Sequence, residues 1–191
     1  MIKIGITGGI GSGKSVVAHL FELCGIPVYV ADERSKILTM TSPVIKQKLT
    51  SLFGEGLYPG NRLDKKQLAT LIFNNEENLR KVNAIIHPEV SKDFTAWTER
   101  QTAPFCAIES AILFESGFDK YVDISLMVYA PQELRIQRAM IRDTASREEL
   151  IARIHHQMAD ETKKELSDAV IINDDQHALI PQIHRFITNL R

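Results

Sequence analysis

The sequence predicts an α/β fold in which a parallel sheet is flanked by helices. Short apolar runs rich in β-branched residues recur along the 191 residues, and segments with a helical apolar period separate them. A long, purely helical stretch follows the second apolar run. Because 44% of the residues are hydrophobic and 25% are charged, the composition is that of an ordinary globular chain.

The first elements form a βαβ unit. Residues 2–7 predict a strand, and a glycine-rich turn follows them. The next apolar residues share one face of a helix: Val16, Val17, Leu20, Phe21 and Cys24. Gly25 then ends this helix, and residues 27–31 predict the second strand.

The stretch 33–101 has the pattern of amphipathic helices. Asp64, with Gln67 three residues later, predicts the N-cap of one of them. His87 and Pro88 are open to two interpretations. Pro88 can mark the first position of another helix, or His87 can contact a substrate.

The strand pattern resumes after this stretch. Residues 105–108 and 124–130 predict strands that are buried on both faces. Residues 131–165 form a second charged helical region. Residues 169–172 predict the last strand, and 179–190 a closing helix.

The glycine-rich turn has the spacing Gly8-x-x-x-x-Gly13-Lys14-Ser15, which is the Walker A pattern between a strand and a helix. Its backbone N–H groups and Lys14 predict binding of the ATP phosphates, and the Ser15 hydroxyl predicts a Mg²⁺ ligand. We expect the nucleotide to be bound by Gly11, Ser12, Gly13, Lys14, Ser15 and Val16. The sequence thus predicts a phosphate donor site and leaves the acceptor open.

Asp32 directly follows the second predicted strand and is our candidate catalytic base. Open α/β sheets carry functional residues at the carboxyl ends of their strands, and a carboxylate there can orient an attacking hydroxyl. The alternative is that Asp32 caps the helix starting at Glu33, and the two roles are compatible. Glu109, at the end of the third strand, is a candidate for a second, metal-linked carboxylate, for which Glu115 competes.

Arginines in the region 131–165 are candidates for neutralising phosphate charge. Arg138 and Arg142 lie on one face of a predicted helix, and Arg147 follows a short break. The alternative is a solvated helix face whose arginines pair with Glu133 and Asp143.

Composition also argues against several classes of function. The formal net charge of -1 disfavours a nucleic-acid partner, and neither a signal peptide nor a membrane span is recognisable, so we expect a cytoplasmic protein. Cys24 and Cys106 are isolated and predict buried free thiols. No obligate protein partner is implied.

An ordered series of blocks resembles the dephospho-CoA kinase family. The blocks are "GITGGIGSGKS", "GNRLDKKQLA", "IF" at 72–73, "IHP" at 86–88, "ILFE" at 112–115, "RAMIRD" at 138–143, "SRE" at 146–148 and Arg153-x-x-x-Gln157. Three places differ from the family pattern: Val30, where an aspartate is frequent, Ala111, where a proline is usual, and Asn173-Asp174-Asp175, in place of Asn-Asn-Gly.

The resemblance implies an enzyme that transfers phosphate from ATP, with Mg²⁺, to the ribose 3′-hydroxyl of dephospho-CoA. It implies one three-layer P-loop kinase domain over 1–191, with 33–101 as a helical CoA-binding insert and 131–165 as a helical lid. The expected catalytic residues are Asp32, Lys14 and Arg142, and the expected substrate contacts are Thr7, Asp32, His87 and Arg138. The alternatives are another P-loop kinase for a nucleoside, nucleotide or sugar, and an NTPase switch. A GTPase switch is disfavoured because the chain has no Asn-Lys-x-Asp guanine signature.

Overall fold

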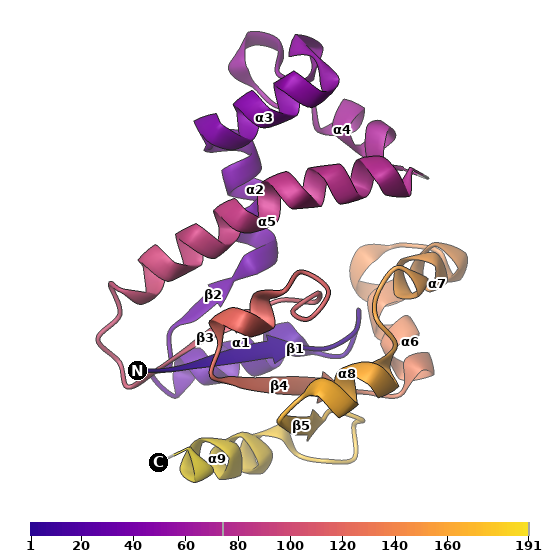
Figure 1. The fold of residues 1–191 in the computed structure, drawn as a ribbon. Helices are drawn as coiled ribbons and strands as arrows, with labels where there is room; N and C mark the ends of the chain where they lie inside the picture. The colour runs from indigo at the N-terminus through magenta and orange to yellow at the C-terminus, as the bar shows by residue number, and fades with distance from the viewer. Residues whose placement is uncertain (74, 191) are drawn as a thin grey trace. The chain divides into compact units, whose positions relative to one another are not determined.

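The computed structural model describes residues 1–73 and 75–190 and divides the chain into two compact units (Figure 1). The first unit joins Met1–Val30 to the chain from Arg100 onward, and the second is Ala31–Glu99. No helix of the described residues is long and apolar enough to cross a membrane.

The first unit contains a five-stranded parallel sheet, which confirms the predicted fold class. Its strands are β1 (Ile2–Thr7), β2 (Val28–Val30), β3 (Phe105–Glu109), β4 (Ile124–Tyr129) and β5 (Ala169–Ile172), in the spatial order β2-β3-β1-β4-β5. The register pairs Glu109 of β3 with Ile6 of β1 and with Val30 of β2. Glu109 therefore lies between two strands at the carboxyl edge of the sheet.

Five α-helices and one 3-10 helix accompany this sheet among the described residues of the first unit. They are α1 (Lys14–Leu23), α6 (Gln132–Asp143), α7 (Arg147–His155), α8 (Asp160–Leu166), α9 (Leu179–Asn189) and the 3-10 helix η3 (Phe118–Tyr121). The main core lies between the sheet and α1 and α9, where Phe21 stacks on Phe186 with 6.1 Å between ring centroids. A smaller cluster joins α6 to α7.

One expectation about the cysteines is wrong. Cys106 is buried in β3, but Cys24 is exposed. Cys24 is the C-cap residue of α1, one position past the end of the helix, and the helical apolar period does not ensure burial there.

In the second unit, every regular element among the described residues is a helix, and the unit has a core of its own. Its helices are α2 (Ala31–Thr41), α3 (Pro43–Phe53), α4 (Lys65–Ile72) and α5 (Glu76–Thr98), with 3-10 turns at Glu55–Leu57 and Pro59–Asn61. Buried residues of this unit include Ile45, Leu49, Leu57, Val82 and Phe94. The predicted cap of α4 is confirmed, because the Asp64 side chain accepts the Gln67 N–H at 2.9 Å.

Two alternative interpretations, each of which places a helix start in this unit, are wrong. Pro88 lies inside α5, which continues to Thr98 because residues on both sides of the proline are packed, among them Ile86 and Val90. Asp32 is not an N-cap, since α2 already begins at Ala31 and places Asp32 in its first turn.

Candidate active site

The phosphate-binding loop connects β1 to α1. Gly13 precedes α1 with φ of 94°, a left-handed conformation that favours glycine, and no side chain among the described residues caps the helix. Because the first N–H groups of a helix have no acceptor within it, this end of α1 can receive an anion.

Two hydroxyl groups beside the loop lack a hydrogen-bond partner. Thr7 Oγ1 and Ser12 Oγ are both buried, and neither has a partner among the described residues. A buried hydroxyl without a partner is costly, and a phosphate oxygen would accept its hydrogen bond. The loop therefore fits the phosphates of ATP both through its helix end and through these hydroxyls.

Lys14 supplies positive charge at the same place. It is 9% exposed, and its Nζ lies 3.9 Å from Oε1 of Glu109, which is itself 6% exposed. Ser15 and Val16, the next two residues, are exposed in the first turn of α1. The predicted nucleotide-binding residues thus form one continuous stretch, with the Glu109 carboxylate next to the lysine.

Asn173 supports the second half of the loop, a role that the sequence did not indicate. Its Nδ2 donates to the Ser12 carbonyl at 2.8 Å, and a Cβ at Gly13 would overlap the Asn173 side chain. Asn173 directly follows β5, so its place at the carboxyl edge of the sheet is the signal that could have identified it.

Arg138 contacts the segment after β5. Its Nη1 donates to the Asn173 carbonyl at 2.9 Å, and its Nη2 pairs with the Asp175 carboxylate. Asp175 has a positive φ of 65°, at the position where glycine is usual in the family pattern. Arg138 is therefore only partly exposed. The solvated-face alternative expects it to pair with Glu133 or Asp143, and these are not the partners observed.

Arg142 and Arg147 are more exposed and have nearby partners. Arg142 donates to both Asp143 carboxylate oxygens, at 2.7 and 2.9 Å, and Arg147 donates to both oxygens of Glu133. The hydrogen bond to Asp143 raises the pKa of Arg142, and the Glu109 carboxylate raises it further. Arg142 is thus paired as the alternative interpretation expects.

Two predicted site residues belong to the helical unit. Asp32 is exposed in the first turn of α2, two residues beyond the end of β2. His87 lies inside α5, and burial lowers its pKa from 6.5. Their roles stay predictions.

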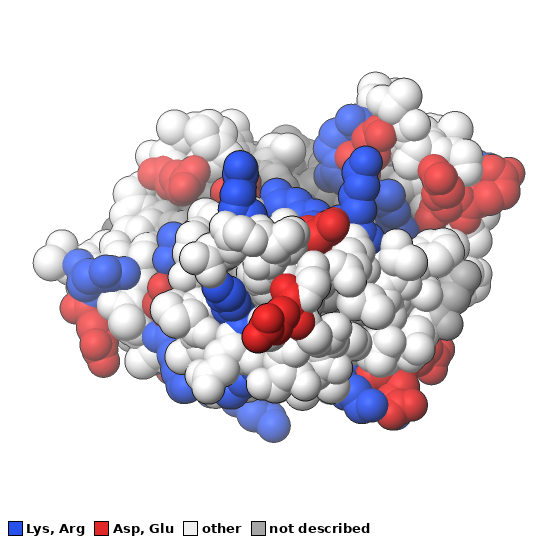
Figure 2. Space-filling view, turned by 90° about the horizontal axis from the view of Figure 1, so that it is seen from above, with Lys and Arg blue, Asp and Glu red and all other residues white. Residues whose placement is uncertain are grey.

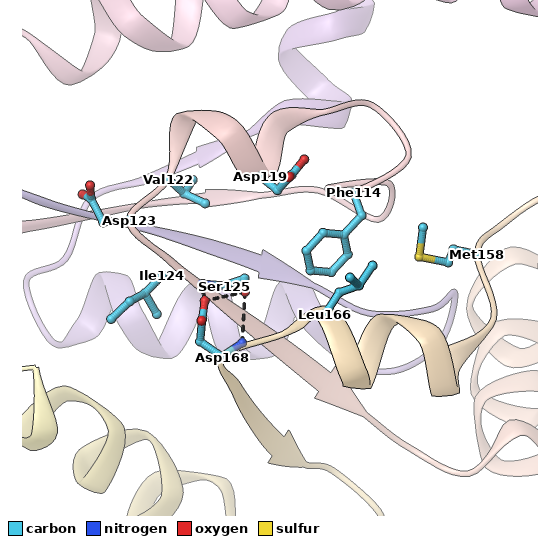
Figure 3. Close-up of a pocket in the computed structure, with 9 residues that line it drawn as sticks. All are labelled: Phe114, Asp119, Val122, Asp123, Ile124, Ser125, Met158, Leu166 and Asp168. Atoms are coloured by element: carbon cyan, nitrogen blue, oxygen red, sulfur yellow. Dashed lines mark hydrogen bonds between the residues drawn. The ribbon is translucent and has the colours of Figure 1, made fainter.

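A cavity of about 370 Å³ is lined by residues of the segment before β4, the start of β4 and the surroundings of α8 (Figure 3). It is near the start of β4 and β5, where the Asp168 carboxylate accepts hydrogen bonds from the backbone and hydroxyl of Ser125. These bonds lower the pKa of Asp168. The residues that line this cavity do not include any of the phosphate-binding loop.

The face seen in Figure 2 carries both basic and acidic side chains, and neither sign covers it alone. Two charged residues of the region 131–165, Arg135 and Lys163, are buried. An alternation of charged residues along a helix does not reveal which of them faces inward.

This chain is similar to known proteins over nearly its whole length. The family model of dephospho-CoA kinase matches residues 2–178. A dephospho-CoA kinase of Bacteroides fragilis is 51% identical over 190 residues, which cover 99% of this chain and 93% of that protein. A crystal structure from Thermus thermophilus is 36% identical with a TM-score of 0.84, and the match covers 99% of this chain and 95% of that one. The dephospho-CoA kinase from Campylobacter jejuni is 25% identical with a TM-score of 0.69, covering 98% and 96%. With these matches spanning nearly its whole length, the chain belongs to the dephospho-CoA kinase family.

Proposed function

We propose that this protein transfers the γ-phosphoryl group of ATP to the ribose 3′-hydroxyl of dephospho-CoA, giving coenzyme A and ADP. The observation that carries the proposal is the near-full-length identity of 51% to a dephospho-CoA kinase. The intact phosphate-binding loop with buried Lys14 agrees with it.

The loop residues perform the donor half of the reaction. Backbone N–H groups from Gly11 to Val16 bind the phosphate oxygens, and Lys14 neutralises charge on the β- and γ-phosphates. The 3′-hydroxyl oxygen bonds to the γ-phosphorus as the bond from that phosphorus to the bridging oxygen breaks. Asp32 orients the hydroxyl and accepts its proton, and ADP leaves.

Other residues support the two substrates. The Ser15 hydroxyl would hold Mg²⁺, which would supply further charge neutralisation. Arg142 stabilises the transferring group, while Thr7, His87 and Arg138 contact substrate. Residues 33–101 act as the CoA-binding insert and 131–165 as the lid. A cytoplasmic location and independence of a protein partner stay predictions.

A direct assay tests the reaction. The protein is incubated with ATP, Mg²⁺ and dephospho-CoA, and coenzyme A is separated by chromatography and identified by mass. Parallel reactions contain a nucleoside, a nucleotide or a sugar as acceptor. We expect turnover only with dephospho-CoA. Turnover with another acceptor alone would favour a different small-molecule kinase, and ATP hydrolysis that no acceptor changes would favour an NTPase switch.

A further inference from the structure

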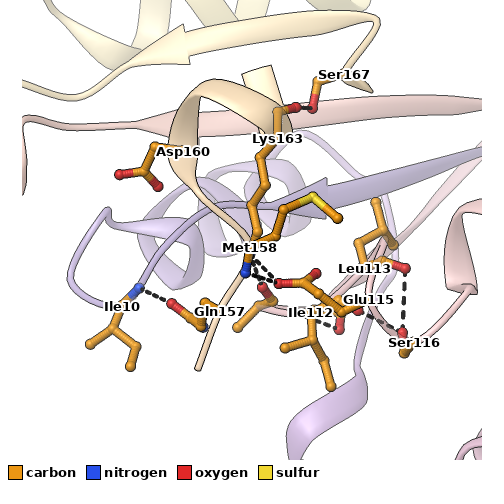
Figure 4. Close-up of polar contacts among 12 residues, drawn as sticks. Ile10, Ile112, Leu113, Glu115, Ser116, Gln157, Met158, Asp160, Lys163 and Ser167 are labelled. Carbon is orange, nitrogen blue, oxygen red and sulfur yellow. Dashed lines mark hydrogen bonds and ion pairs between the residues drawn. The ribbon is translucent and has the colours of Figure 1, made fainter. Parts of the chain in front are cut away.

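Ile10, in the first half of the phosphate-binding loop, is held at both of its backbone polar groups by side chains from the region 131–165. Its N–H donates to Gln157 Oε1 at 3.1 Å (Figure 4), and its carbonyl accepts from Arg135 Nη1 at 3.4 Å. The Ile10 side chain also packs against the cluster of α6 and α7, which includes Ile136 and Leu150. The conformation of this loop residue is therefore set by a segment more than a hundred residues away.

Arg135 is a buried cation whose main partner is a carboxylate. It is 2% exposed, and its Nη2 lies 2.5 Å from Oδ2 of Asp160. A buried guanidinium is costly unless its charge is paired, and a buried ion pair is weak evidence for a gain in stability. Arg135 Nε has no partner among the described residues, so the arrangement is not the best one for stability alone.

Two glycines of the loop leave room for Arg135. A Cβ at Gly9 would overlap the Arg135 guanidinium, and a Cβ at Gly11 would overlap the Arg135 backbone carbonyl. These positions therefore bring α6 into direct contact with the loop. Part of the glycine-rich composition serves this contact as well as the approach of phosphate.

Asp160 is itself fixed, because α8 is anchored to the segment after β3. Buried Lys163 donates to the Ala111 carbonyl at 2.6 Å and pairs with Glu115 Oε1 at 2.9 Å (Figure 4). Glu115 Oε1 also accepts the Met158 N–H at 2.9 Å. Asp160 begins this helix, so its carboxylate presents a fixed partner to Arg135.

We propose that Arg135, held by Asp160, is a positioning residue that shapes residues 9–11 of the phosphate-binding loop for the phosphates before the nucleotide binds. It acts through its hydrogen bond to the Ile10 carbonyl. The Arg135 side chain is buried and shielded from solvent. Binding sites need their supporting residues locked in place, since a small displacement of the contacting groups is costly. The proposal rests on the proposed function only in that the loop binds nucleotide phosphates.

Nucleotide affinity tests this role separately from the phosphate-transfer reaction. ADP and dephospho-CoA binding are each measured by calorimetry for the full chain and for Arg135→Met, and thermal unfolding is followed without ligand. Arg185→Met, which removes an exposed arginine on α9, is the matched control. We expect Arg135→Met to weaken ADP binding on the order of 10-fold, with unchanged affinity for dephospho-CoA, and the control to match the wild type.

Several outcomes would overturn the proposal. One is an unchanged ADP affinity with a lower melting temperature, because that is the signature of a purely structural ion pair. Equal losses of affinity for both ligands would do the same. If Arg135→Met does not fold, Asp160→Asn, which keeps the shape of the carboxylate, is measured in its place with the same criteria. ADP affinity is measured without an acceptor, so failure of the dephospho-CoA assay leaves this test intact.

Discussion

The phosphate-binding loop and the helical unit differ in where their interactions come from. The loop presents backbone groups to its ligand, and side chains from distant segments, such as Asn173 and Gln157, hold it from the protein side. In the helical unit, two charged side chains that are distant in the sequence pair with each other. Arg34 donates two hydrogen bonds of 3.0 Å to Asp93, 59 positions away.

This difference explains why the proposed donor site can be recognised more easily than the proposed acceptor site. A phosphate-binding loop needs one strand, one turn and one helix in sequence, so its spacing is fixed by local geometry. An acceptor site on packed helices depends on side chains brought together from far along the chain. Helical periodicity reveals that such helices are amphipathic, but it does not identify their ligand.

The largest effect is expected on the donor side. Replacing Lys14 by Ala should lower kcat by about 10²–10³-fold, because a charge aimed at the transferring phosphoryl group is lost. Steady-state kinetics with dephospho-CoA measure this. Lys92→Ala, which removes an exposed lysine of α5, is the control and should keep wild-type kcat. A wild-type kcat for Lys14→Ala would contradict the proposed role of the loop.

Asp32 tests whether the helical unit contributes to chemistry as well as to binding. Asp32→Asn removes the proton acceptor and should lower kcat by on the order of 10²-fold, with little change in the KM for ATP. The adjacent exposed Glu33 offers a matched control, and Glu33→Gln should keep the wild-type kcat. If Asp32→Asn also keeps the wild-type kcat, Asp32 is not the proton acceptor.

The sequence predicted the five strands and the phosphate-binding loop because strongly apolar runs and one local motif define them. It did not predict that α5 runs through Pro88, since packing on both sides outweighs the lost hydrogen bond. It also missed Arg135 and Asn173, whose contacts to the loop join positions 125 and 161 residues apart. Contacts at such separations leave no periodic trace in a single sequence.

A smaller effect is expected for Tyr58→Phe, which tests whether the stability of the helical unit influences nucleotide binding. The buried Tyr58 hydroxyl donates to the Thr39 carbonyl at 2.8 Å, near the end of α2, where helix carbonyls lack partners within the helix. Tyr58→Phe should therefore lower the free energy of unfolding by about 1 kcal/mol without changing ADP affinity. Chemical denaturation and calorimetry measure the two quantities, and Tyr121→Phe, at an exposed tyrosine, is the control. A change in ADP affinity would show that the two units are energetically coupled.

The smallest effect is expected on the pH dependence of stability, through His87. Burial lowers the pKa of His87 from its usual value of 6.5. Because the unfolded chain then binds a proton more readily than the folded one, the contribution of His87 to stability is complete above about pH 6.5 and is lost as the pH falls through the folded pKa. His87→Gln should flatten this part of the stability profile, measured by denaturation between pH 5 and 8, a range in which an unperturbed histidine changes its charge.

NMR titration of the His87 ring, with and without each ligand, tests whether His87 responds to the acceptor or to the nucleotide. If His87 contacts the acceptor, dephospho-CoA should shift its titration and ADP should not, whereas equal shifts with both ligands would mean that the helical unit senses the occupied phosphate-binding loop.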